Sequence, residues 1–160
     1  ASAGLDAIVT SPLRRAVRTA EEVAGVTGAP LITDEGFRET DFGAWEGLTF
    51  AAVRERWPDE LRAWLADPDA APPGGESFAA VSTRVTEALH RVLAGRERQR
   101  ILIVSHVTPI KTLVAAALLA PSAALFRMHL DVAALSEIDW YSDGPAVLRS
   151  FNDTSHLPSQ

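Results

Sequence analysis

Short apolar runs alternate with amphipathic segments along most of the chain, and this alternation constrains the fold more than any other feature. The clearest run is "RILIVSH" (100–106), whose consecutive apolar residues lack polar alternation and therefore predict a strand covered on both faces. Residues 5–9 and 30–34 predict two further strands. Strands that take turns with helices favour a sheet with helices on both sides. The predicted fold is an α/β three-layer sandwich with a mainly parallel central sheet.

The helices are predicted by apolar residues spaced at i, i+3, i+4 and i+7. They are expected at residues 11–25, at residues 48–66 in two pieces, at residues 78–95 and from residue 108 onward. In the first helix, Ser11 suits the N-cap, Pro12 the first helical position and Gly25 the end. Pro58 should break the second region, because proline cannot continue a helix. The last helix is apolar almost all round and should be buried.

Two segments between the predicted helices and at the end of the chain have turn-rich compositions. Residues 67–77, "DPDAAPPGGES", read either as a linker or as a pocket loop. We favour the loop, because both flanks are helical and the chain is short. Residues 130–153 alternate apolar and polar positions around "SDGP", which predicts a hairpin at the edge of the sheet.

Composition bounds the function classes. The 160 residues suit one domain, residues 1–160, and the net charge of −6 argues against direct nucleic-acid binding. The absence of cysteine excludes disulfides and thiolate metal sites, and it is compatible with the cytoplasmic location that we expect. The longest nearly apolar stretch, residues 113–119, is too short to span a membrane. We therefore expect no membrane partner, and the oligomeric state is not readable.

In open α/β sheets, ligands bind beyond the carboxyl ends of the strands. If the first and third predicted strands are parallel, Arg15 and His106 emerge at the same edge. Arg14 and Arg18 crowd Arg15 near a helix N-terminus, where the dipole disfavours cations, and a bound anion would relieve that repulsion. The alternatives are solvated arginines covering the helix and a histidine that satisfies a nearby backbone group.

The segment "FRETDFGAWEG" (37–47) holds Glu39, Asp41 and Glu46 among aromatic residues and glycines. Burial beside aromatic rings raises the pKa of a carboxyl group, as a general acid requires. The alternative is an ordinary polar loop held in place by Trp45. Composition does not decide between the two.

Four motifs in this order carry a family resemblance: "SPLRRAVRTA" (11–20), "FRETDFGAWEG" (37–47), "PGGES" (73–77) and "VSH" (104–106). Together they resemble the phosphatase branch of the histidine phosphatase superfamily, which has the phosphoglycerate-mutase-like fold. "VSHVTPIKTLV" (104–114) and "FNDTSHL" (151–157) are similar to the acid phosphatase domain of actinobacterial bifunctional ribonuclease H/acid phosphatase proteins. This narrower resemblance implies a possible fusion to an N-terminal ribonuclease H domain.

The resemblance implies a chemistry for three residues. Family members transfer a phosphoryl group to a nucleophilic histidine and then hydrolyse the phosphohistidine. Arg15 matches the arginine that binds the phosphate, and Glu39 matches the proton donor. His106 matches the second histidine, which would stabilise the transferred phosphoryl group as a charged donor. The implied substrate is a small phosphate monoester, and the scheme needs no cofactor and no metal. The remaining histidines, His90, His129 and His156, show no ligand spacing.

The chain departs from the family pattern at the nucleophile. The family's Arg-His-Gly motif precedes all the motifs quoted above, and no Arg-His pair occurs in the 160 residues. We expect the nucleophile upstream of residue 1, in a strand and helix of roughly 30 or more residues. The alternative is a fold completed in some other way. A smaller departure is Val107-Thr108, where many relatives carry glycines.

Three functions follow from these observations. The first is an acid phosphatase, or phosphomonoesterase, whose nucleophile lies upstream; the resemblance favours phosphatase over mutase activity. The second is a catalytically incompetent remnant that binds a phospho-ligand or a partner through Arg15, Glu39 and His106. The third is a different α/β enzyme that uses His106 as a general base, although no G-x-S-x-G elbow accompanies this histidine.

Overall fold

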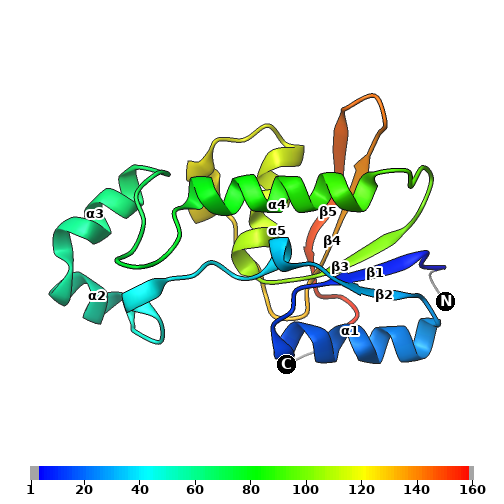
Figure 1. Cartoon of the computed structure of the whole chain (residues 1–160), viewed down its shortest axis with the longest axis horizontal. Coiled ribbons are helices and arrows are strands. Elements are labelled where there is room, and N and C mark those ends of the chain that lie inside the picture. The colour runs from blue at the N-terminus through cyan, green and yellow to red at the C-terminus, as the bar shows by residue number, and fades with distance from the viewer. Residues whose placement is uncertain (1–3, 159–160) are drawn as a thin grey trace.

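The fold is built on a parallel sheet whose middle strand is the first in the chain. The computed structural model describes residues 4–158; the outermost residues of the predicted domain, 1–3 and 159–160, lie outside it. The strands are β1 (Ala7–Thr10), β2 (Leu31–Thr33) and β3 (Ile101–Val104). Their order is β2-β1-β3, and both pairings are parallel (Figure 1).

β1 is the fully buried strand, and the prediction that residues 101–104 form a strand covered on both faces is confirmed, because Ile101 and Ile103 pack on the α4 side and Leu102 and Val104 on the α1 side. All four residues of β1 are buried, whereas those of β3 are partly exposed. The reason is position in the sheet: β1 lies between two neighbours, while β3 pairs only with β1 among the described residues. A run of apolar residues signals burial but does not reveal the order of the strands.

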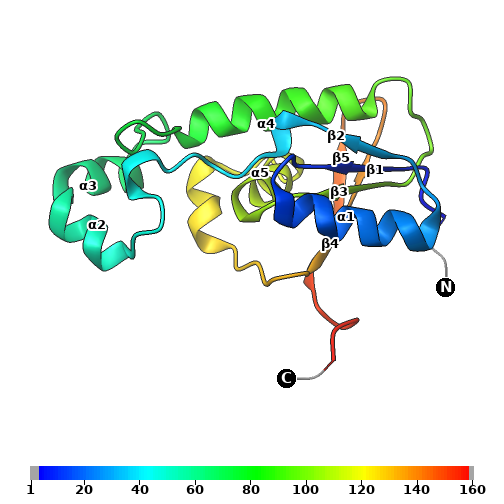
Figure 2. The same cartoon turned by 60° about the horizontal axis from the view of Figure 1, so that its bottom comes forward.

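Helices cover both faces of the parallel sheet. The helices are α1 (Arg14–Thr27), α2 (Phe50–Arg56), α3 (Pro58–Ala66), α4 (Phe78–Leu93) and α5 (Val107–Ala117), with short 3-10 turns at Glu35–Phe37, Gly43–Trp45 and Ser122–Arg127. Figure 2 shows α1 and α4 on opposite sides of the sheet. The predicted three-layer α/β/α arrangement is therefore confirmed. No helix between residues 4 and 158 has both the length and the hydrophobicity needed to cross a membrane.

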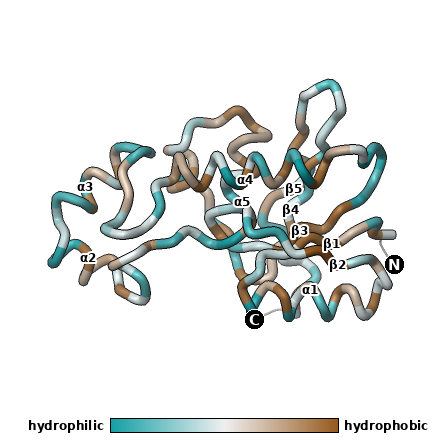
Figure 3. The backbone as a smooth tube through the Cα atoms, in the orientation of Figure 1, coloured by the Kyte–Doolittle hydropathy of each residue, from teal (hydrophilic) through white to brown (hydrophobic). Residues whose placement is uncertain are grey.

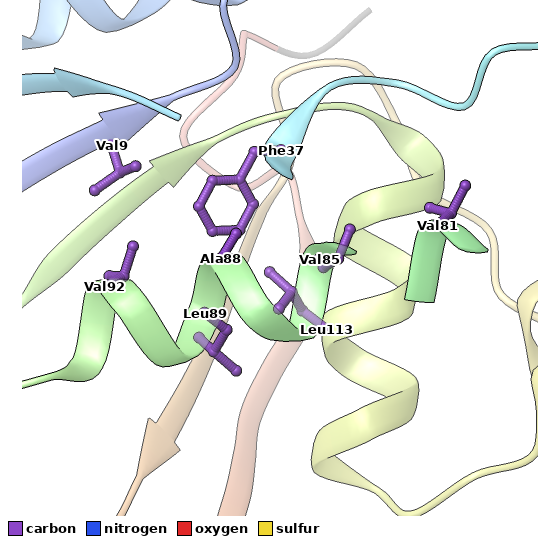
Figure 4. Close-up of a cluster of buried hydrophobic side chains, with 8 residues drawn as sticks. All are labelled: Val9, Phe37, Val81, Val85, Ala88, Leu89, Val92 and Leu113. Atoms are coloured by element: carbon purple, nitrogen blue, oxygen red, sulfur yellow. The ribbon is translucent and has the colours of Figure 1, made fainter. Parts of the chain in front are cut away.

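The core divides into two parts because successive residues of β1 point to opposite faces. Ile8 packs with Ala20 and Ala29 on the α1 side. Val9 packs with Phe37 on the α4 side, where α4 supplies the buried stripe Val81, Val85, Ala88, Leu89 and Val92 (Figure 4). The hydrophobic colouring is concentrated on the strands and on the helix faces toward them (Figure 3). Phe37 therefore fixes the segment that follows β2 onto α4.

The ends of α1 differ from those predicted. The helix begins at Arg14 instead of Pro12, because the side chain of Ser11 is buried and bonds elsewhere. It continues through Gly25 and ends where Gly28 takes a left-handed conformation at φ 72° and donates its N–H to Ala24 O. The predicted break at Pro58 is confirmed, since this proline opens α3.

The hairpin at the end of the chain is confirmed, but its place is not the predicted one. Strands β4 (Leu135–Trp140) and β5 (Ala146–Asp153) pair antiparallel around the predicted turn. Among the described residues they form a separate two-stranded sheet and do not extend the edge of the parallel one. They remain attached to it through the core, because Ile138 and Trp140 pack against the buried cluster of α4.

Helices α2 and α3 form a lobe at one end of the molecule (Figure 1). Its core is aromatic: the ring of Trp64 lies 5.7 Å from that of Trp45 and 5.4 Å from that of Phe126. The loop at residues 67–77 returns along the segment that enters the lobe, with Glu76 N donating to Asp41 O at 2.8 Å and Ala44 N to Pro73 O at 2.9 Å. These bonds make it a fixed loop and not a linker.

Candidate active site

The carboxyl ends of β1 and β3 bring together residues that are distant in the chain. Arg15 lies in the first turn of α1 after β1, and His106 follows β3 directly. Arg15 Nε donates to His106 Nδ1 at 3.2 Å, and His106 Nε2 lies 2.7 Å from Ser11 Oγ. The prediction that Arg15 and His106 emerge at the same edge is therefore confirmed.

These two contacts define the protonation state of His106 in the unliganded site. A guanidinium nitrogen can only donate, so Nδ1 must accept, and the ring proton lies on Nε2, which donates to Ser11 Oγ. Burial lowers the pKa of His106 below its ordinary value, and the charge of Arg15 lowers it further, against an opposing effect of Glu39. The ring is therefore neutral at pH 7, and an incoming anion would favour its protonation.

Glu39 is the acidic residue of the 37–47 segment whose charge acts on His106. Its Oε1 accepts a hydrogen bond from the amide of Thr40 at 2.8 Å. The other two carboxylates serve the loop itself: Asp41 Oδ1 accepts from Gly43 N at 2.8 Å, and Glu46 Oε1 accepts from Phe42 N at 3.0 Å. Trp45 is buried, so the aromatic anchor of this loop is present as well. The structure thus places Arg15 against His106, with the charge of Glu39 acting on the same ring.

Sequence reasoning missed three residues that build this site. Ser11 was predicted to cap α1, but its hydroxyl bonds to His106 and accepts from Leu13 N at 3.2 Å. Ser105 Oγ donates to Phe37 O at 2.7 Å and ties the end of β3 to the Glu39 segment. Arg84 donates to the carbonyl oxygen of Glu39 at 3.2 Å. A signal for Arg84 was available, since this charge lies at the edge of the apolar stripe of α4, one turn after Val81 and one turn before Ala88.

Within residues 4–158, no cluster of three or more His, Cys, Asp or Glu side chains could hold a metal ion. The remaining histidines have local partners or face solvent. His129 Nε2 lies 2.9 Å from Asp131 Oδ1, His156 Nε2 lies 3.0 Å from Ala133 O, and His90 is exposed. Besides Arg15, which contacts His106, the charges of Glu39 and Arg84 act on the pKa of this ring. A guanidinium, an imidazole and a carboxylate can together bind an anion and exchange a proton.

Comparisons with known proteins agree with this geometry. Residues 1–154 match the family described as "Histidine phosphatase superfamily (branch 1)". The chain is 48% identical over 154 residues to the "Bifunctional protein Rv2228c" of Mycobacterium tuberculosis, covering 96% of this chain and 42% of that protein. It is 32% identical to "Phosphoserine phosphatase 1" of Hydrogenobacter thermophilus, covering 96% of this chain and 72% of that enzyme.

A solved structure extends the similarity to the fold. The chain superposes on "Bacillus stearothermophilus YhfR" with a TM-score of 0.87 at 32% identity, covering 98% of this chain and 78% of that one. The chain spans 42% of the length of its mycobacterial relatives.

Proposed function

The chain belongs to the histidine phosphatase superfamily, and we propose that it forms most of the catalytic domain of a phosphatase that hydrolyses small phosphate monoesters. The observation that carries the proposal is the meeting of Arg15 and His106 at the carboxyl ends of β1 and β3, with the charge of Glu39 acting on the same histidine. A cation, a titratable ring and a carboxylate are the groups that phosphoryl transfer requires around a phosphate.

Arg15 and His106 would bind the phosphate. The Nε of Arg15 is used by His106, and among residues 4–158 its terminal Nη groups have no hydrogen-bond partner. These two donors suit the oxygens of a phosphate, which a guanidinium binds in a bidentate way. A dianionic phosphate would raise the pKa of His106. Nδ1 would then take up a proton, lose its hydrogen bond from Arg15 Nε and donate to the transferring group. Ser11 would then hold the ring in orientation through Nε2.

Glu39 would supply and recover the proton. A histidine nitrogen attacks phosphorus, the bond to the ester oxygen breaks, and Glu39 protonates the departing alkoxide. Glu39 then takes a proton from water, whose oxygen attacks the phosphohistidine. The phosphorus–nitrogen bond breaks, and inorganic phosphate leaves. All atoms and charges balance without a metal or a cofactor.

We propose that the nucleophile comes from residues that precede residue 1. No Arg-His pair occurs in the 160 residues. The outer edge of β3 has no strand partner among the described residues, and its sequence, Ile-Leu-Ile-Val, carries none of the charges or prolines that protect exposed edges. A strand pairing there would end beside His106. The greater length of the relatives supports the existence of such a segment.

The substrate class and the partner follow from the relatives. One relative is named a phosphoserine phosphatase, which supports a small phosphorylated molecule and favours hydrolysis over mutase chemistry. Another is named a bifunctional protein and is more than twice as long as this chain, which supports a second domain in the same polypeptide. The sequence resemblance supports a ribonuclease H domain as that second domain and acid phosphatase as the activity.

The proposal is tested on the natural polypeptide that contains this chain. Its intact mass should exceed that of the 160 residues, and it should hydrolyse p-nitrophenyl phosphate without sensitivity to EDTA. During turnover a radiolabelled substrate should leave an acid-labile, alkali-stable phosphoprotein, as phosphohistidine does. His106→Ala should abolish most of the turnover. Binding of inorganic phosphate with no turnover would instead favour the catalytically incompetent remnant.

A further inference from the structure

We propose that Arg84, held by Glu76, is a positioning residue that sets the placement of Glu39 for proton transfer. This inference rests on the proton-donor role given to Glu39 in the proposed function. Neither Arg84 nor Glu76 was predicted as part of the site. The evidence is the way in which the backbone leading to Glu39 is held.

The segment Gly36–Glu39 pairs with no strand in the described part of the chain, and side chains bond to its carbonyl groups instead. Its four successive carbonyl groups each accept a hydrogen bond from a side chain. Arg84 donates to Gly36 O at 2.9 Å, to Arg38 O at 2.9 Å and to Glu39 O at 3.2 Å, and Ser105 donates to Phe37 O at 2.7 Å. The bonds to Gly36, Phe37 and Glu39 are partly buried, where an unpaired carbonyl is costly, so they help to determine where the segment lies. Three of the four come from Arg84.

Glu76 fixes Arg84 and also holds the residues that follow Glu39. Its two carboxylate oxygens accept from Nε and Nη2 of Arg84 at 2.8 Å and 2.9 Å, a bidentate pair. The side chains of the pair are only 22% and 29% exposed. Glu76 Oε2 also accepts from Asp41 N at 2.9 Å, and Glu76 N donates to Asp41 O at 2.8 Å. The Arg84–Glu76 pair therefore forms hydrogen bonds to the backbone on both sides of Glu39.

These backbone hydrogen bonds also affect the position of the Glu39 carboxyl group, because that group is bonded to the neighbouring backbone. Oε1 of Glu39 accepts from the amide of Thr40 at 2.8 Å, so the carboxylate moves with residues 39–41. A displacement of about 1 Å in a reacting group can cost about a hundredfold in rate. Lysine cannot replace Arg84, because an ammonium lacks the planar fork that reaches the carbonyls and the carboxylate together.

A second ion pair on the same helix provides a matched control. Arg91 lies seven residues after Arg84 and donates to Asp34 with Nη2 at 2.8 Å and Nε at 3.2 Å. Asp34 in turn accepts from Gly36 N at 2.8 Å. This pair holds the beginning of the segment but makes no hydrogen bond to residues 38–41. Arg91→Lys removes the same kind of fork without touching the placement of Glu39.

The experiment compares two substrates in the natural polypeptide. An alkyl phosphate needs its leaving oxygen protonated, whereas p-nitrophenyl phosphate does not, and kcat/KM reports the step in which the leaving group departs. Arg84→Lys should lower kcat/KM about 10- to 100-fold for the alkyl phosphate and less than about threefold for p-nitrophenyl phosphate. Inhibition by inorganic phosphate should stay unchanged. Arg91→Lys should leave both substrates unaffected.

A double-mutant cycle separates this inference from the function on which it rests. In a Glu39→Gln background, Arg84→Lys should cause no further loss on the alkyl phosphate, because both changes remove the same proton transfer. Equal losses on both substrates, or additive losses in the cycle, would overturn the positioning role. A Glu39→Gln variant with unchanged selectivity between the substrates would overturn the proton-donor role instead. If Arg84→Lys does not fold, Glu76→Gln carries the same comparison.

Discussion

Arg15 Nε lies 3.2 Å from Nδ1 of His106, although the two residues are 91 positions apart in the sequence. The contact places a permanent cation beside a titratable ring and uses the one ring nitrogen that can accept a proton. An anion bound at the site would therefore have to act on both groups. Several measurable properties of the protein depend on this pair.

The pKa of His106 should respond to a bound anion. In the unliganded protein, burial and the charge of Arg15 hold this pKa below the ordinary value of 6.5. Phosphate or vanadate should raise it, because an anion stabilises the imidazolium. NMR titration of the ring protons measures both values, with His106→Asn used to assign the signal. A pKa that stays the same when saturating phosphate is added would argue against phosphate binding at this site.

The same lowered pKa predicts how stability depends on pH. In the unfolded chain the pKa of His106 is near 6.5, and in the folded protein it is lower. The folded protein therefore binds this proton less tightly than the unfolded chain does. The contribution of His106 is therefore fully present above pH 6.5, and it is lost as the pH falls from 6.5 toward the folded-state pKa. Urea unfolding at several pH values should show a steeper acid-side loss for the wild type than for His106→Asn. Parallel curves would contradict the neutral, buried ring.

Arg15→Lys should weaken binding of the transition state although the charge is retained. Lysine lacks the planar fork with which a guanidinium binds two phosphate oxygens. We expect kcat/KM for p-nitrophenyl phosphate to fall about 100-fold, as when one transition-state donor is lost, and vanadate inhibition to weaken. Arg14→Lys is the matched control, since Arg14 is the exposed neighbour on the same turn and has no role in the site. An unchanged kcat/KM in Arg15→Lys would show that only local positive charge matters and would contradict the bidentate role.

Substitution of Gly36 tests the packing of the segment that carries Glu39, and substitution of Gly25 in α1 provides a comparison. A Cβ at Gly36 would lie 2.5 Å from Cβ of Ala88 and 2.9 Å from the carbonyl oxygen of Arg84, so Gly36→Ala should destabilise by about 1–3 kcal/mol. A Cβ at Gly25 meets nothing within 4 Å, and this residue lies inside α1. Gly25→Ala should therefore stabilise by about 0.5–1 kcal/mol. Thermal unfolding monitored by circular dichroism checks both signs, and a stable Gly36→Ala protein would contradict the contact with α4.

The layers of the fold and the meeting of Arg15 with His106 could be predicted, because both depend on local patterns and on the geometry of parallel strands. The order of the strands could not, since β1 and β3 are both continuous apolar runs and only their neighbours distinguish them. The role of Ser11 was missed for a similar reason. Its local context matches an N-cap, but a histidine 95 positions away takes the hydroxyl.

Arg84 is a second residue whose role depends on contacts that are distant in the sequence. Its charge lies at the edge of the apolar stripe of α4, which marks it as unusual in the sequence. Its partners Gly36, Arg38 and Glu39, however, lie 48, 46 and 45 positions earlier in the chain. Local periodicity carries no information about such contacts, so only the folded structure shows which groups Arg84 binds.

The bonds that join residues 41–44 to residues 73–76 have a consequence for how the family can diversify. They close the α2–α3 lobe at its base, so that both ends of the lobe leave the rest of the molecule at one place. A segment tied off in this way can change length or sequence while Arg84, Glu76 and Glu39 keep their positions. The lobe also packs on residues outside it, because Trp64 contacts Phe78 and Phe126, so a segment grafted from a relative must preserve these contacts as well as the base if the catalytic centre is to stay in place.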